Sequence, residues 1–231
     1  MGACLWLGSC RESANPPSAA APVVVPVVAP ALPVPAAAAP VGHAITIKGR
    51  IRNDLPEASF SLLADDAPET AGVLHVRAIE IRPDNRSEST QRIDGLATDT
   101  PWSATTPALE LLDMNFDGYA DIRLVKSRPA GPNVPYLNWL YEPADGRFVE
   151  SRGLNAITSP QFDATAREVR SDWRGSAARY GTDVYTFRDG QLVPLRRETK
   201  VYKRAGVYTL QTSQWVDGAW RAVESRERRD P

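Results

Sequence analysis

Cysteine is nearly absent from this chain, and its position limits the kinds of site the protein can have. Only two of the 231 residues are cysteines, Cys4 and Cys10, and both lie within the first ten. Residues 43–231 therefore contain neither an internal disulfide nor a thiolate metal site. A cysteine-free domain is compatible with the cytosol or the periplasm and argues against a small secreted fold held by disulfides.

Histidine and long apolar runs are equally scarce. His43 and His75 are the only imidazoles, and neither has the spacing of a metal site or a catalytic triad. No serine lies in a nucleophile elbow, and no glycine-rich phosphate loop is present. The most apolar stretch, residues 23–34, is interrupted by prolines that would break a membrane-spanning helix. We therefore expect a non-enzymatic protein. A carboxylate pair for glycan hydrolysis stays open, because its members need not be near in sequence.

The first ten residues resemble the end of a bacterial lipoprotein signal. Leu7, Gly8, Ser9 and Cys10 follow the lipobox order of an apolar residue, two small residues and the cysteine that takes the lipid. Only nine residues precede Cys10, fewer than a basic region plus an apolar segment requires. We interpret residues 1–10 as a truncated lipoprotein signal, with Cys10 as the lipidation site. The alternative is a chance cysteine in a short apolar leader.

Residues 11–42 read as a tether. They hold eight of the 20 prolines and only two charged residues, Arg11 and Glu12. Proline at short intervals removes backbone donors and fixes φ, so this segment is expected to be an extended, disordered Pro/Ala-rich linker. At about 3.1 Å per residue it reaches roughly 100 Å. Arg11 follows the lipid cysteine where an aspartate would signal inner-membrane retention, which favours the outer membrane.

Residues 43–231 have the composition of a single all-β domain. Residues 44–52 and 72–82 alternate apolar and polar side chains, as half-buried strands do. Three Asp-Gly pairs, at 145–146, 189–190 and 217–218, separate apolar runs, and this pattern predicts antiparallel hairpins. Three hairpins indicate a sandwich or a propeller-like domain. The helix candidates are short: residues 59–63 and 164–167.

One segment carries recognisable chemistry. Residues 113–121 read DMNFDGYAD, with oxygen-bearing side chains at loop positions 1, 3, 5 and 9 and a glycine at position 6. This is the first part of the EF-hand ligand order, but position 12 is Leu124 rather than glutamate. Because the flanking segments look like strands, we predict a calcium loop in a β context. Its expected Ca²⁺ ligands are Asp113, Asn115, Asp117, the Tyr119 carbonyl and Asp121; the alternative is an Asx-rich turn without metal.

At this loop and the hairpin after it, the chain resembles a known family. Residues 109–125, the segment YLNWLYEPADGRFV at 136–149, and PQFD at 160–163 occur in an order similar to that of periplasmic immunity lipoproteins. Those proteins protect bacteria from lysozyme-like effectors of rival type IV secretion systems and are related to periplasmic lysozyme inhibitors. The resemblance covers about 55 residues, plus the lipobox and tether. It implies an all-β fold, a structural Ca²⁺ and inhibition by occluding the glycan cleft of a hydrolase.

The partner contacts are expected next to the calcium loop. Residues 127–135 contain three prolines where family members have a Gly/Asn-rich loop, so the contact residues carry over poorly. In this region we name Arg128, Asn133 and Tyr136 as candidates, with Arg128 suited to pair with a catalytic carboxylate. The alternative is an ordinary connecting loop.

Charge is unevenly distributed along the chain. Residues 53–121 hold 14 acidic and four basic side chains, and residues 196–231 hold nine basic and five acidic ones. Such asymmetry can steer charged partners, but a solvated surface accounts for any single run. We treat the basic residues 226–229 as a frayed end rather than a nucleic-acid patch.

These observations favour a periplasmic, lipid-anchored and calcium-stabilised inhibitor of a lysozyme-like peptidoglycan hydrolase. Its expected partners are that hydrolase and, through the lipid, a membrane; nucleic acid is not expected. The alternative is a structural or sensory envelope lipoprotein that binds the cell wall or another envelope complex.

Overall fold

The computed structural model describes residues 42–65, 72–84, 90–103 and 107–230. All of them belong to one compact unit, Ala39–Pro231. The predicted signal at 1–10, Cys10, and all but the last residue of the tether at 11–42 lie outside the described residues. The described part of the chain is nearly all strand, with one short helix, α1 (Arg152–Asn155), so the predicted all-β class is confirmed. It contains no helix long and apolar enough to cross a membrane.

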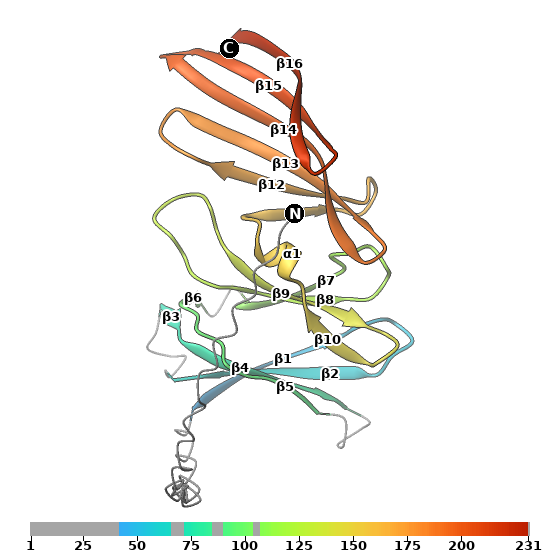
Figure 1. Ribbon diagram of the computed structural model, residues 1–231. Helices are drawn as coiled ribbons and strands as arrows, with labels where there is room; N and C mark the ends of the chain where they lie inside the picture. Colours follow the sequence, from blue (N-terminus) through green and yellow to red (C-terminus); the bar gives the residue numbers. More distant parts are fainter. Residues whose placement is uncertain (1–41, 66–71, 85–89, 104–106, 231) are drawn as a thin grey trace, which may run out of the picture. The chain divides into compact units, whose positions relative to one another are not determined.

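The first sheet is formed by the blue and green strands of Figure 1. Its strand order is β1-β2-β4-β5, and every pairing is antiparallel. The strands are β1 (His43–Arg50), β2 (Glu57–Ala64), β4 (Val76–Pro83) and β5 (Gln91–Ile93). Two further strands, β3 (Val73–Leu74) and β6 (Thr100–Pro101), pair with each other as a separate antiparallel ribbon.

Two details of this first sheet differ from the sequence-based prediction. Residues 59–63, named as a helix candidate, lie in β2, where buried and half-buried residues alternate strictly. The helix prediction was wrong because this period of two is that of a strand. Residues 72–82, read as one strand, are divided between β3 and β4, which pair with different partners.

The second sheet carries the loop with the candidate calcium ligands. Its order is β10-β9-β8-β7, again antiparallel. The strands are β7 (Leu109–Leu112), β8 (Asp121–Val125), β9 (Tyr136–Glu142) and β10 (Arg147–Glu150). Fifteen buried residues form one core with members from the first two sheets, including Phe60, Ile122 and Trp139.

The third sheet is an up-and-down meander of six strands, coloured from yellow-orange to red in Figure 1. The strands are β11 (Pro160–Asp163), β12 (Glu168–Arg174), β13 (Arg179–Arg188), β14 (Gln191–Arg204), β15 (Val207–Val216) and β16 (Ala219–Arg229). A second cluster of five buried residues packs β12 of this sheet against the 113–121 loop, β9 and α1. Across β13 to β16, Val184 and Val207 are the buried apolar residues.

The predicted Asp-Gly hairpins all exist, in two forms. At 189–190 and 217–218 both residues have positive φ, and the flanking pairs Arg188–Gln191 and Val216–Ala219 close two-residue turns. This is the type I′ geometry that Asp-Gly favours. At 145–146 only Gly146 has positive φ, and a four-residue loop joins β9 to β10.

Candidate functional site

The loop at 113–121 connects β7 to β8 and has an unusual backbone. Gly118 has a φ of 90°, which glycine adopts without steric cost, but Phe116 has a φ of 64°. For a residue with a Cβ, the left-handed region costs about 1–2 kcal/mol. The Phe116 ring is buried in the second cluster and meets Phe187 edge-on, with ring centroids 6.5 Å apart. Burial of this ring therefore anchors the loop and offsets the backbone strain.

Inside the loop, side-chain oxygens accept hydrogen bonds from the loop's own backbone. The two carboxylate oxygens of Asp113 accept from the amides of Asp117 at 3.1 Å and Gly118 at 2.9 Å. Asp117 accepts from the Tyr119 amide at 2.9 Å and from the Asn115 side-chain amide at 2.9 Å. These bonds curl the loop and bring the candidate ligands of positions 1, 3 and 5 onto its inner side.

Asp121 ties the loop to the second sheet. Its side chain is fully buried, and its two oxygens accept from the backbone amides of Met114 at 2.7 Å and Tyr141 at 2.8 Å. Burial raises the pKa of Asp121 to about 7, and the nearby Asp117 and Asp113 carboxylates add to the rise. The two amides act in the opposite direction. Ionisation of this carboxyl is therefore costly unless a positive charge is added.

The donor chemistry of the loop fits calcium, although the carboxylates do not converge on one point. Carboxylate, amide and carbonyl oxygens are the ligands that Ca²⁺ prefers. Within the described residues, however, no three His, Cys, Asp or Glu side chains lie close enough together to hold a metal ion. Occupation by a cation would require the Asp113, Asp117 and Asp121 carboxylates to turn toward one centre.

The outer side of the loop packs against the first sheet. The Arg52 guanidinium lies 4.2 Å from the centroid of the Tyr119 ring and donates to its hydroxyl at 2.5 Å. The Ala120 amide donates to the Ile51 carbonyl at 2.6 Å, and the Tyr119 ring lies 5.4 Å from that of Tyr141. The loop is therefore tied to the turn after β1 and to β9.

The three candidate partner contacts occupy different environments. Arg128 is exposed, in the exposed stretch 128–132. Asn133 exchanges two hydrogen bonds with the Arg174 backbone, at 2.9 and 2.8 Å, so it fastens this segment to the end of β12. Tyr136 is half-buried, with the Arg123 guanidinium 4.6 Å from its ring centroid. Of the three, Arg128 is the one whose side chain is presented to solvent.

Sequence patterns gave no sign of a charged cluster on the third sheet. Asp183 is buried, and its carboxylate accepts from Arg197 at 2.6 and 2.5 Å, from the Trp173 indole at 3.0 Å and from the Tyr185 hydroxyl at 3.2 Å. The Arg197 guanidinium also lies 4.4 Å from the centroid of the Trp220 ring. These residues come from β12, β13, β14 and β16, so only the sheet register brings them together.

Comparison with known proteins yields a likeness of fold. No protein-family model matches the chain, and no curated protein does. A solved structure described as that of a Xanthomonas type IV secretion system related protein has a similar fold, with a TM-score of 0.56 and 15% sequence identity. The match covers 79% of this chain and 99% of that chain. The two therefore share an architecture over nearly the whole of the solved protein.

Proposed function

We propose that this chain is a periplasmic lipoprotein, anchored through Cys10, that binds and inhibits a lysozyme-like peptidoglycan hydrolase without catalysing a reaction itself. The observation that carries the proposal is the fold likeness to a type IV secretion system related protein over 99% of that protein's length. The sequence resemblance at 109–163 points independently to immunity lipoproteins of the same context. The fold likeness supports the secretion-system context, and the sequence resemblance supports the finer reading as an immunity lipoprotein.

The segment after β8 supports an inhibitory mode of binding. The backbone at Ser127 forms a bridge with Asp99, and the Asn133 side chain is bonded to β12, so the exposed stretch 128–132 is held at both ends. A loop fixed in this way loses little conformational entropy when it enters a concave cleft. Arg128 would then form a charge-assisted contact with a catalytic carboxylate of the hydrolase.

Calcium binding is the second part of the proposal. One Ca²⁺ would be held by Asp113, Asn115, Asp117, Asp121 and the Tyr119 carbonyl. Because only the folded loop offers this set of ligands, the ion should raise the melting temperature. The test compares melting in excess CaCl₂ and in EDTA. Asp117→Ala should abolish the difference, whereas Asp145→Ala, in the exposed β9–β10 turn, should preserve it. Identical wild-type curves in the two buffers, with no ion retained, would contradict the site.

The inhibition test is a peptidoglycan turbidity assay. Lysis by lysozyme-like effectors encoded beside this gene is followed with and without the purified protein in molar excess. We expect stoichiometric inhibition by the wild type and at least tenfold weaker inhibition by Arg128→Glu. Lysis that proceeds unchanged with every such effector would refute the immunity proposal, and lysis by the protein alone would show an enzyme instead.

The anchoring proposal is tested by fractionation of cells that express the chain behind a full-length signal sequence. The wild type should be found with membranes, and Cys10→Ser should release it into the soluble periplasm. Wild-type protein found in the soluble cytosol would argue against both the anchor and the inhibitory role.

A further inference from the structure

The outer end of the third sheet is strongly cationic. Three chain segments, 174–180, 200–208 and 226–230, hold eight Arg and Lys residues and only two acidic ones, Glu227 and Asp230. We call these segments together the basic end. They come from β12, β13, β14, β15 and β16 and the turns between them. The sequence pattern indicated only the last of the three segments, because the others are distant along the chain.

Strand register places one set of side chains from these segments on a single face of the sheet, while the residues between them, such as Arg179 and Arg229, point to the other face. Residues paired across neighbouring strands point to the same side. One row of such partners crosses five strands and consists of Arg174, Tyr180, Lys200, Leu210 and Arg226. A second row crosses three strands and consists of Tyr202, Tyr208 and Arg228. Basic and tyrosine side chains are thus interleaved on a single surface.

The three tyrosines of this face are held by one another. The ring centroids of Tyr180 and Tyr202 lie 6.0 Å apart, and those of Tyr202 and Tyr208 lie 5.2 Å apart. The Lys200 ammonium lies 5.3 Å from the centroid of the Tyr208 ring. All three rings are half-buried, so each keeps part of its surface open to solvent. A pre-ordered aromatic strip of this kind can bind at a small cost in side-chain entropy.

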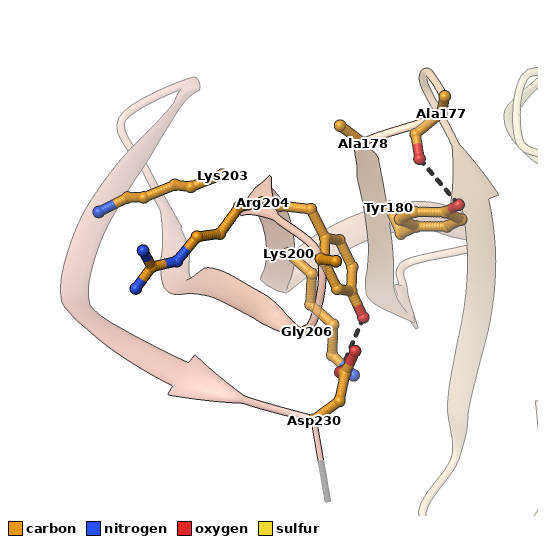
Figure 2. Close-up of a pocket in the computed structure, with 10 residues that line it drawn as sticks. Ala177, Ala178, Tyr180, Lys200, Lys203, Arg204, Gly206 and Asp230 are labelled. Carbon is orange, nitrogen blue, oxygen red and sulfur yellow. Dashed lines mark hydrogen bonds between the residues drawn. The ribbon is translucent and has the colours of Figure 1, made fainter.

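A hollow of about 740 Å³ lies beside this strip, and Figure 2 shows the side chains that line it. The Tyr202 hydroxyl donates to the Asp230 carboxylate at 3.0 Å, and Lys203 pairs with Glu227 at 3.1 Å. Within the described residues, Lys200 and Arg204 have no carboxylate partner. Figure 2 shows the Arg204 side chain extending away from Asp230. The hollow therefore keeps two cations available for an incoming carboxylate.

The composition of this face matches that of a protein interface. Tyrosine and arginine are enriched in such interfaces and at their energetic hot spots. The basic end takes in about five residues on each of four strands, a sheet area of roughly 300 Å² at standard strand spacings. That area is smaller than the ~800 Å² that each partner buries in a typical stable complex, so the basic end suits a weak, transient contact.

We propose that the basic end is a docking surface for an acidic protein. Lys200 and Arg204 pair with its carboxylates, and Tyr180, Tyr202 and Tyr208 pack against the chain that carries them. The basic end borders the 128–132 segment, since Pro132 and Arg174 line one hollow. The proposal goes beyond the inhibitory role and does not depend on which hydrolase the protein inhibits.

The test uses poly-L-glutamate as the acidic polypeptide and the full chain as the binder. Binding is measured by fluorescence anisotropy of the labelled polymer at 20 and 200 mM salt. We expect the wild type to bind at low salt, and binding to weaken at least tenfold at high salt and at least tenfold in Lys200→Glu/Arg204→Glu. The matched control is Lys126→Glu/Arg188→Glu, which has the same change in net charge at exposed positions away from the basic end and should bind like the wild type.

Two further measurements distinguish a protein-binding surface from loss of folding and from a membrane surface. Melting temperatures of all variants within about 2 °C exclude unfolding as the cause of lost binding, and Tyr208→Ala should weaken binding severalfold where Tyr208→Phe does not. The proposal is overturned if the wild type fails to bind the polymer or if the control pair weakens binding as much as the test pair. Tighter binding to phosphatidylglycerol vesicles than to the polymer would overturn it too, in favour of a membrane surface.

Discussion

The two halves of the domain are stabilised in different ways. The first two sheets share a core of fifteen buried residues, among them Phe60, Leu62, Ile122 and Leu124, all fully buried. Strands β13 to β16 contribute only two buried apolar residues, Val184 and Val207. They are joined instead by long antiparallel ladders and by contacts such as the Asp183–Arg197 pair and the edge-on Trp215–Trp220 rings, 5.1 Å apart.

This difference indicates which part of the domain tolerates changes of side chain. In a close-packed core each methylene group contributes to stability, so its residues are constrained by packing. On an uncovered sheet face, packing does not restrict which side chains can occur, because backbone hydrogen bonds hold the strands together. Such side chains can instead serve binding. The core half therefore supports the 113–121 loop, and the meander carries the basic and aromatic face.

The largest effect is expected from breaking the core. Phe60→Ala removes a fully buried ring that meets Phe148 edge-on at 5.9 Å, and such truncations cost about 3–5 kcal/mol. Urea denaturation should show the loss by both far-ultraviolet and tryptophan signals in one transition. Val201→Ala, at an exposed position of β14, is the control and should change the unfolding free energy by less than about 0.5 kcal/mol. A loss below about 1 kcal/mol for Phe60→Ala would contradict the assignment of the core.

The next effect concerns the loop and its dependence on pH without calcium. The pKa of Asp121 is about 7 in the folded chain, against an ordinary value of 3.8, so the folded state retains a proton that the unfolded state loses. The contribution of Asp121 to stability should therefore be fully present below its ordinary pKa of 3.8 and should be lost as pH rises to about 7. Linkage gives an upper bound of about 4 kcal/mol for this group.

The measurement is the urea midpoint in EDTA at pH 5 and pH 8, repeated with CaCl₂. In EDTA the midpoint should be lower at pH 8, and calcium should restore most of the difference. Asp121→Asn cannot ionise at this position and should lose the Asp121 part of the pH dependence. A midpoint in EDTA that rises from pH 5 to pH 8 would contradict the burial of an ionisable Asp121.

A smaller effect is expected from the charged cluster of the meander. Asp183→Asn removes the negative charge that receives two bonds from Arg197, and hydrogen bonds to charged groups contribute about 1.5–3 kcal/mol. We expect a loss of about 2 kcal/mol, near the lower end of that range, because Arg197 keeps 27% of its side chain in water. Urea denaturation measures it. Arg196→Gln, which breaks the more exposed pair with Glu168, is the comparison and should cost less than about 1 kcal/mol.

The smallest effect should be local. Trp220→Ala removes a half-exposed ring over Arg197 in the edge strand β16, which we expect to cost about 1 kcal/mol. Amide hydrogen exchange should increase in β15 and β16 and stay unchanged in β8 and β9. Equal acceleration in all four strands would show that the sheets unfold as one unit and would remove the contrast between the two halves.

Local patterns predicted the strands and turns better than the sites. Alternation at 44–52 identified β1, and Asp-Gly identified three hairpin turns, because both signals depend on residues adjacent in sequence. The turn at Ala205-Gly206, which joins β14 to β15, lacked the Asp-Gly signal and was missed. Helix α1, capped by the Ser151 side chain, is a single turn too short for periodicity to reveal.

The site was predictable only where it is local. The candidate ligands at 113–121 are contiguous in sequence, so the curled conformation of the loop could be predicted from their spacing. The burial of Asp121 and its bond to the Tyr141 amide depend on β9, twenty residues later, and could not be inferred. The bonds of Asn133, a candidate partner contact, to the end of β12 also depend on a distant segment, and the basic end needs the register of five strands. Contacts between residues far apart in the chain could not be predicted from local sequence patterns.

The meander also has a consequence for how the chain acquires its structure. From β11 to β16 every strand pairs with the strand next to it in the chain, so each added strand closes a loop of only a few residues. Short loops cost little entropy to close, and local contacts form quickly. The sheet can form one hairpin at a time from β12 to β16. Its last strands can therefore pair after the core has folded, and folding of the core does not depend on them.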